Sequence, residues 1–153
     1  MATFNFKSSG KTSTQKSLNQ PFTTPPVGIR TPLRLGESDI FSMHYDTADQ
    51  IHDNLRNLLL TNWGERVGFY YFGANLRKLT TEITDIDQFD DAAIVNIRDA
   101  VSKWMPFVSL KDFSSSVDHS SNIDTGIVKI KITYGVPQLG VENRSLQVTL
   151  YTI

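Results

Sequence analysis

Hydrophobic residues recur at helical spacing through the middle of the chain, beginning shortly after Tyr45. Thr47, followed by Gln50 three residues later, forms a capping box, which predicts that a helix begins there. Gly64 is expected to end this helix in a left-handed turn. The predicted apolar face, with residues three or four apart, consists of Ala48, Ile51, Leu55, Leu58 and Leu59.

Two further helices are predicted before the hydrophobic period changes. A short helix covers residues 74–83, and a longer one begins within the acidic run 85–91, whose carboxylates favour the positive end of a helix dipole. Pro106 ends the longer helix, because proline disfavours the helical conformation in the residue before it. The apolar stripe of the longer helix is Ile94, Ile97, Val101 and Trp104.

In the last third of the chain, apolar and polar residues alternate with the period of β-strands. Strands are predicted at Phe107–Phe113, Gly126–Tyr134 and Ser145–Ile153, with a polar connector at Ser114–Asp124 and a shorter strand at Asp39–Tyr45. The expected core-facing positions of the last two strands are Val128, Ile130, Ile132, Tyr134, Leu146, Val148 and Leu150. The predicted fold class is therefore α+β: two to three N-terminal helices packed on a small C-terminal antiparallel sheet, with an extended N-terminal arm.

The N-terminal residues differ from the rest in composition and charge. Polar residues and prolines dominate residues 1–36, so we divide the chain into an extended arm (1–36) and one α+β domain (37–153). The first 35 residues carry five basic and no acidic side chains, whereas the remainder carries ten basic and sixteen acidic ones. A cationic arm on an acidic body is expected to bind an acidic protein surface or a neighbouring subunit. Five spread charges are a weak footprint for nucleic acid.

Several kinds of chemistry receive no support from the sequence. The 153 residues include no cysteine, which excludes disulfides and thiolate metal sites, and no apolar run approaches membrane-spanning length. The histidines, His44, His52 and His119, are far apart, and His52 is expected to face solvent. The acidic run 85–91 lacks the glycine and the bidentate glutamate of a calcium loop. No catalytic residue, metal, cofactor, small-molecule substrate or membrane partner is predicted, although a carboxylate pair that meets in space stays open.

The stretch TNWGERVGFYYFG, residues 61–73, is unusually aromatic for a connector between helices. In one interpretation its aromatic residues fill the core beneath a glycine-rich loop. That interpretation does not place all five of them, nor the adjacent Glu65 and Arg66. Because adjacent side chains in an extended chain point in opposite directions, these two charges are expected to meet separate partners.

The same stretch carries a resemblance. Thr-x-x-Gly-Glu-Arg at a helix end, followed by Phe-Gly-x-x-Leu, resembles the baseplate wedge family of contractile-tailed phages and its type VI secretion relatives. The matching residues are Thr61, Gly64, Glu65, Arg66, Phe72, Gly73 and Leu76. The family's second motif, Glu-Pro-Arg, reads Met105-Pro106-Phe107 here, so both charges are replaced by apolar side chains. The contact made by that motif in the family would be made here through apolar packing, or elsewhere.

The resemblance implies a non-enzymatic structural protein of the virion tail baseplate, assembled in the host cytoplasm. Such a protein joins the wedge core to the contractile sheath and starts sheath assembly; its implied partners are other wedge proteins, the tail sheath protein and the tube-initiator protein. A cell-wall hydrolase of the tail and a stand-alone binding module for an acidic partner are the alternatives. The expected partner-binding residues are Trp63, Gly64, Glu65, Arg66, Phe72, Gly73, Met105, Pro106, Phe107, Leu146, Val148 and Leu150.

The last predicted strand, Ser145–Ile153, is followed by no segment that could cover its edge. An uncovered edge is a template for a strand from a neighbouring molecule. Equally, this strand could lie inside the sheet of its own domain.

Overall fold

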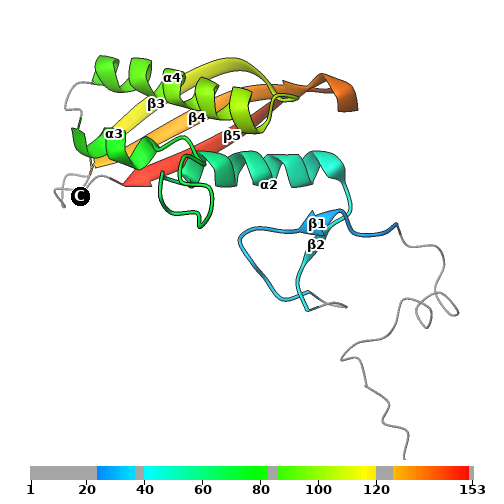
Figure 1. The fold of residues 1–153 in the computed structure, drawn as a ribbon. Coiled ribbons are helices and arrows are strands. Elements are labelled where there is room, and N and C mark those ends of the chain that lie inside the picture. The colour runs from blue at the N-terminus through cyan, green and yellow to red at the C-terminus, as the bar shows by residue number, and fades with distance from the viewer. Residues whose placement is uncertain (1–23, 37–39, 83–85, 120–125, 152–153) are drawn as a thin grey trace, which may run out of the picture.

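The computed structural model describes residues 24–36, 40–82, 86–119 and 126–151. Its body has two layers, with three helices packed against one face of an antiparallel sheet (Figure 1). The helices are α2 (Thr47–Leu60), α3 (Leu76–Glu82) and α4 (Ile86–Trp104). The α+β class predicted from the sequence is therefore confirmed.

The sheet contains β3 (Ser109–His119), β4 (Gly126–Val136) and β5 (Val141–Tyr151), in the order β3-β4-β5. The short helix η1 (Pro137–Leu139) and Gly140, whose φ is 64°, connect β4 to β5. Apolar residues pair across the two strands, as in Ile130 opposite Val148. Since alternate residues of a strand point to opposite faces, this pairing places one apolar face under the helices and leaves the other face polar.

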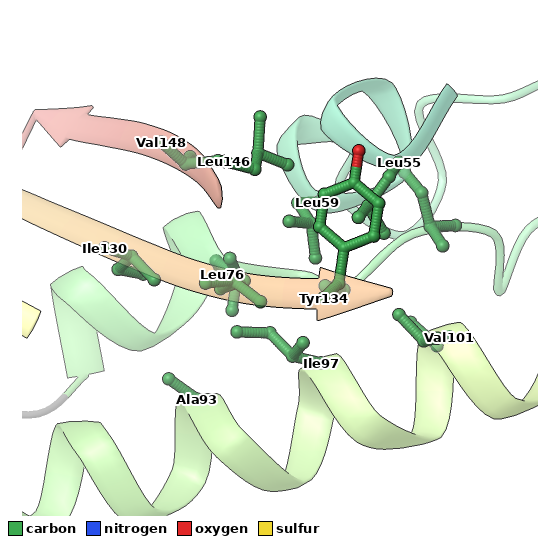
Figure 2. Close-up of a cluster of buried hydrophobic side chains, with 14 of the residues drawn as sticks. Leu55, Leu59, Leu76, Ala93, Ile97, Val101, Ile130, Tyr134, Leu146 and Val148 are labelled. Carbon is green, nitrogen blue, oxygen red and sulfur yellow. The ribbon is translucent and has the colours of Figure 1, made fainter. Parts of the chain in front are cut away.

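The core lies between the helices and the apolar face of the sheet (Figure 2). The predicted stripes of α2 and α4 and the predicted inner faces of β4 and β5 all contribute to it. Fully burying one such leucine or isoleucine stabilises the fold by about 1.5–3 kcal/mol. The residues labelled in the figure are Leu55, Leu59, Leu76, Ala93, Ile97, Val101, Ile130, Tyr134, Leu146 and Val148.

The ends of α2 differ from the sequence prediction. Asp46 is the N-cap instead of Thr47, because the Asp46 carboxylate accepts a hydrogen bond from the backbone N–H of Ala48. The helix ends at Leu60 with Thr61 in an extended conformation. Gly64 has a positive φ of 86°, but it lies within the following loop and does not terminate the helix.

The strand boundaries also differ. β3 extends to His119, so most of the predicted polar connector Ser114–Asp124 belongs to the sheet, and its described partners lie on β4. Ser115 lies opposite Ile130 on the helix-facing side, where its hydroxyl donates to the carboxylate of Asp90 over 2.5 Å. The neighbouring strand and this bond to α4 override the loop propensity of the serine run.

Part of the segment assigned to the arm is structured. β1 (Gly28–Ile29) pairs antiparallel with β2 (Met43–His44). Of the strand predicted at Asp39–Tyr45, Asp39 lies outside the described residues, and among residues 40–45 only Met43 and His44 form a strand. Residues 1–23 of the arm lie outside the described residues. His52, expected to face solvent, is instead half-buried, and its Nδ1 lies 2.9 Å from the hydroxyl of Tyr134. Burial lowers the pKa of His52 and raises the pKa of Tyr134.

Candidate partner-binding groove and aromatic loop

The loop of residues 61–75, called here the aromatic loop, closes back onto the end of α2. The backbone N–H of Ala74 donates to Leu58 O over 3.2 Å, and that of Asn75 donates to Thr61 O over 3.3 Å. These bonds satisfy carbonyl groups that the helix end leaves without an intrahelical donor. Gly73 makes the closure possible: its φ is 110°, and a Cβ at this position would lie 2.1 Å from Thr61 O.

The aromatic side chains of the loop lie largely on the surface. Trp63 is 45% exposed, and Tyr70 and Tyr71 are 62% and 60% exposed. Trp63 and Tyr71 pack edge to face with ring centroids 5.6 Å apart, and the Trp63 indole N–H donates to Gly73 O over 3.1 Å. The interpretation that these aromatic residues fill the core is therefore wrong for most of them. Their contacts fix their orientation without burying them.

Glu65 is bound within the loop. Its carboxylate accepts hydrogen bonds from the backbone N–H of Asn62 over 2.8 Å and from the side-chain amide of Asn62 over 2.9 Å. The backbone bond, followed by the side-chain bond, holds the pKa of Glu65 below its ordinary value. Glu65 therefore stabilises the turn 62–65 as an ionised acceptor.

Arg66 has a different environment. Its guanidinium carbon lies 4.3 Å from the ring centroid of Phe72 and 5.5 Å from that of Phe69. Both rings pack edge to face on Trp104 at the end of α4. Within the described residues the guanidinium has neither a hydrogen bond nor an ion pair, and Glu65 does not pair with it. The rings of Phe69 and Phe72 therefore orient the guanidinium of Arg66, and its N–H groups are available to an acceptor on a partner.

A groove of about 680 Å³ lies beside Arg66. It joins the aromatic loop to the turn after α4, so residues about forty positions apart in the sequence meet in one surface feature. The lining includes polar amide side chains from α2 and apolar side chains from the aromatic loop, the end of α4 and the turn after it. The lining residues are Asn54, Asn57, Leu58, Thr61, Glu65, Arg66, Phe72, Trp104, Met105 and Phe107.

Five of the twelve residues predicted to bind partners line this groove: Glu65, Arg66, Phe72, Met105 and Phe107. The other predicted residues lie outside its lining. Trp63, Gly64 and Gly73 shape the aromatic loop, and Pro106 is exposed at the turn after α4. Leu146, Val148 and Leu150 are buried in the core of the chain itself. A partner strand would therefore meet the backbone edge of β5, which has no second strand neighbour among the described residues, and not these three side chains.

The sequence analysis missed the asparagines of the site. Asn54 and Asn57 line the groove, and Asn62 binds Glu65 and also accepts from the backbone N–H of Arg77 over 3.3 Å. Asn75 adopts a positive φ of 53° at the start of α3, and its side chain accepts from the backbone N–H of Trp63. Asparagine tolerates a positive φ better than most residues. This preference is the one feature of the sequence that could have indicated the role of Asn75.

Two polar clusters lie away from the groove. Asp53 is buried and contacts His44, Arg56 and the backbone of Thr31. Arg144 of β5 forms an ion pair with Asp49 of α2; the hydrogen bond from Arg144 lowers the pKa of Asp49. Among the described residues, no group of three or more histidines and acids is arranged to hold a metal ion. No helix in that part of the chain has the length and apolarity to cross a bilayer.

Comparison with known proteins identifies a fold. A chain of the anti-feeding prophage baseplate is 20% identical with a TM-score of 0.57, covering 69% of this chain and 81% of that one. A proposed tail lysozyme from Geobacter sulfurreducens is also 20% identical, with a TM-score of 0.54, and the match covers 72% of this chain and 95% of that one. A chain of the type VI secretion baseplate complex is 16% identical, with a TM-score of 0.44, and the match covers 68% of this chain and 92% of that one.

No protein-family model and no curated protein matches the sequence. The chain shares the α+β fold of the prophage baseplate chain and of the proposed tail lysozyme, and the resemblance predicted from the sequence is confirmed at the level of the fold.

Proposed function

We propose that this protein is a structural component of a contractile-tail baseplate, assembled in the host cytoplasm, where it joins the wedge core to the sheath. The observation that carries the proposal is the groove, in which a guanidinium without an ion pair among the described residues lies beside apolar side chains, on a fold similar to that of a prophage baseplate chain. Aromatic side chains and arginine are enriched in protein–protein interfaces and among the residues that contribute most to binding.

The groove specifies what a wedge partner must provide. Arg66 requires a carboxylate, because a cation closed into an interface without a partner costs several kcal/mol. Phe72, Met105 and Phe107 require an apolar side chain next to that carboxylate. Met105 and Phe107 thus supply apolar contact where the resembled family carries charges.

The sheath would contact a different part of the molecule. Among the described residues β5 pairs with β4 alone, so its other backbone edge is the place where a strand from the tail sheath protein could add. Adding one strand there would start a sheath ring and set its register beside the tube initiator. Purified protein is then expected to shorten the lag of sheath polymerisation; an unchanged lag would contradict the sheath part of the proposal alone.

Replacing Arg66 tests the wedge contact. Arg66→Ala loses a surface cation–π contact worth about 0.5–1 kcal/mol, so the monomer stays folded by circular dichroism, but sheathed tails are absent from electron micrographs. Arg98→Ala is the matched control, because Arg98 is an exposed arginine on α4 outside this groove. Normal contractile tails from Arg66→Ala, in number and length, would overturn the proposal.

A cell-wall hydrolase is the second candidate, because a neighbour in fold is a proposed tail lysozyme. Glu65 is the one carboxylate that lines the groove within the described residues, and its pKa is lowered. A glycosidase general acid requires a raised pKa and most such enzymes need a second carboxylate, so this geometry favours the structural role. Release of soluble fragments from peptidoglycan, abolished by Glu65→Gln, would instead favour the hydrolase.

A further inference from the structure

The guanidinium of Arg66 is oriented by neighbours that must themselves be held in place. Arg66 is exposed, and an exposed arginine ordinarily samples several rotamers. Among the polar and ring contacts of the described residues, its guanidinium has only those with Phe69 and Phe72. The residue that fixes these two rings therefore also determines where the cation of the groove points.

The backbone of the aromatic loop brings these three side chains together. The backbone N–H of Phe69 donates to Arg66 O over 3.2 Å, and that of Phe72 donates to Phe69 O over 3.0 Å. Two β-turns thus follow each other, and the first and last residues of a β-turn lie within roughly 7 Å of each other. Gly68 has a φ of 83° at the third position of the first turn. These turns place the side chains near one another but do not fix their rotamers.

Trp104 contacts both rings from outside the loop. Its indole ring packs edge to face on Phe69, with centroids 5.8 Å apart, and on Phe72, with centroids 5.1 Å apart. Such pairs are directional as well as apolar, so they restrict how each ring is turned. The ammonium of Lys103 lies 5.3 Å from the same indole ring and 6.0 Å from the ring of Tyr71, which adds a second link between the loop and the end of α4.

Trp104 is supported by a rigid element. It is the last residue of α4, and the backbone N–H of Met105 donates to Val101 O over 2.8 Å, so the helical hydrogen bonds continue past it. The backbone N–H of Val108 donates to Met105 O over 2.9 Å and closes the turn that follows. Val101 and Met105 are both buried. A side chain held on a helix in this way orients its neighbours more precisely than one held on a loop.

We propose that Trp104 is the positioning residue of the groove: its indole ring fixes Phe69 and Phe72, and these two rings present the guanidinium of Arg66 to the partner. This inference rests on the proposed function. Restricting the rotamers of Arg66 before binding lowers the entropic cost of binding. The indole N–H is not required for this role, because it is buried and has no hydrogen-bond acceptor among the described residues.

A direct contact between Trp104 and the partner is the alternative, because Trp104 also lines the groove. The two roles differ in the free protein. If Trp104 positions Arg66, replacing Trp104 changes the environment of the guanidinium before any partner is present. If Trp104 acts only by touching the partner, Arg66 in the free protein is unaffected.

NMR spectra of the free protein separate these roles without a baseplate. The side-chain protons of Arg66 are expected upfield of their ordinary positions, because the guanidinium lies over two rings whose currents shield it. Trp104→Leu should return them to ordinary positions, whereas Trp104→Phe, which keeps a ring and removes an N–H without an acceptor, should leave them upfield.

Unchanged Arg66 signals in a folded Trp104→Leu variant would overturn the inference and leave the baseplate role intact. Wild type alone provides a test that needs no variant. Nuclear Overhauser effects are expected between the indole protons of Trp104 and the rings of Phe69 and Phe72. Their absence would overturn the inference as well.

Incorporation into baseplates is the second readout. In competition with wild type, Trp104→Leu is expected to enter purified baseplates about tenfold less well, as for loss of an important interface residue, and Trp104→Phe within about twofold of wild type. Val101→Ala, folded by circular dichroism, is the control for lost stability, because Val101 is buried on α4 outside the groove lining, and it should compete like wild type.

Full incorporation of Trp104→Leu would overturn the inference, and so would a loss of equal size in Trp104→Phe or in Val101→Ala. Absence of wild type from purified baseplates would instead refute the proposed function.

Discussion

Leu55, Ile130 and Tyr134 of the helix–sheet body are fully buried, whereas Val67 and Tyr70 of the aromatic loop are 98% and 62% exposed. The two regions have similar proportions of hydrophobic residues but are ordered by different forces. The body is held by burial of apolar faces that match the helix and strand periods. The loop is held by backbone hydrogen bonds, ring contacts and one glycine conformation, which keep its side chains fixed and accessible.

The two regions are expected to differ most in the free energy of unfolding that is lost when a hydrophobic side chain is truncated. Leu55→Ala is expected to lower the free energy of unfolding by about 3–4 kcal/mol, because the site is fully buried and a cavity remains. Val67→Ala, at a fully accessible position, should change it by less than about 0.5 kcal/mol. Urea unfolding followed by circular dichroism measures both. Comparable losses in the two variants would show that the loop contributes to the core.

The glycines of the loop test whether backbone geometry orders it. Gly73→Ala is expected to cost about 3 kcal/mol, because φ is 110° and the new Cβ would lie 2.1 Å from Thr61 O. Gly68→Ala is the matched control: φ is 83°, but nothing lies within 4 Å, so only the conformational cost of about 1 kcal/mol applies. Thermal unfolding of both variants provides the measurement. Equal shifts in Tm would contradict the close approach at Gly73.

The contact between Asp53 of α2 and the hairpin formed by β1 and β2 adds a dependence on pH to the stability of the fold. Burial raises the pKa of Asp53, but hydrogen bonds from His44 and Thr31 and the nearby Arg56 outweigh it, so the pKa lies below its ordinary value of 3.8. The ionised carboxylate therefore stabilises the fold at neutral pH, and this contribution is lost as pH falls below about 4.

We expect wild type to lose up to about 1 kcal/mol more between pH 5 and pH 3 than Asp53→Asn, because one carboxyl with an ordinary pKa of 3.8 in the unfolded chain can lose no more than this over that range. Urea unfolding at each pH gives the comparison, and proteolysis within residues 24–36 should increase in wild type over the same range. Parallel pH profiles for the two proteins would show that Asp53 does not anchor the hairpin through its charge.

The sequence predictions were accurate for the segments ordered by apolar burial and less accurate for those ordered by individual polar contacts. The faces of α2, α4, β4 and β5 were predictable, because burial against a second layer imposes a period that the sequence displays. The extension of β3 through its serines was not, since Ser115 is held by Ile130 across the sheet and by Asp90 on α4. Contacts of this kind arise only once distant segments are packed together.

The candidate site was only partly predictable. The motif around Glu65 and Arg66 indicated the loop, and the family resemblance indicated Met105 and Phe107, but no sequence period joins the two segments. The Asn62–Glu65 bond and the Thr31–Asp53 anchor depend on backbone N–H groups, which every residue except proline carries. Hydrogen bonds to the backbone leave little specific signal in one sequence.

The smallest expected effect concerns Glu65, whose bonds lie entirely within the loop. Because the folded pKa of Glu65 lies below its ordinary value of 4.5, its bonds to Asn62 should persist as the pH falls to that value and be lost below it. The backbone amide signal of Asn62 in NMR spectra is expected to titrate below pH 4.5, and Glu65→Gln should remove this titration while changing the free energy of unfolding by less than about 0.5 kcal/mol. A midpoint at or above 4.5 would mean that Asn62 does not hold the carboxylate. Glu65 would then be available, like Arg66, for a partner.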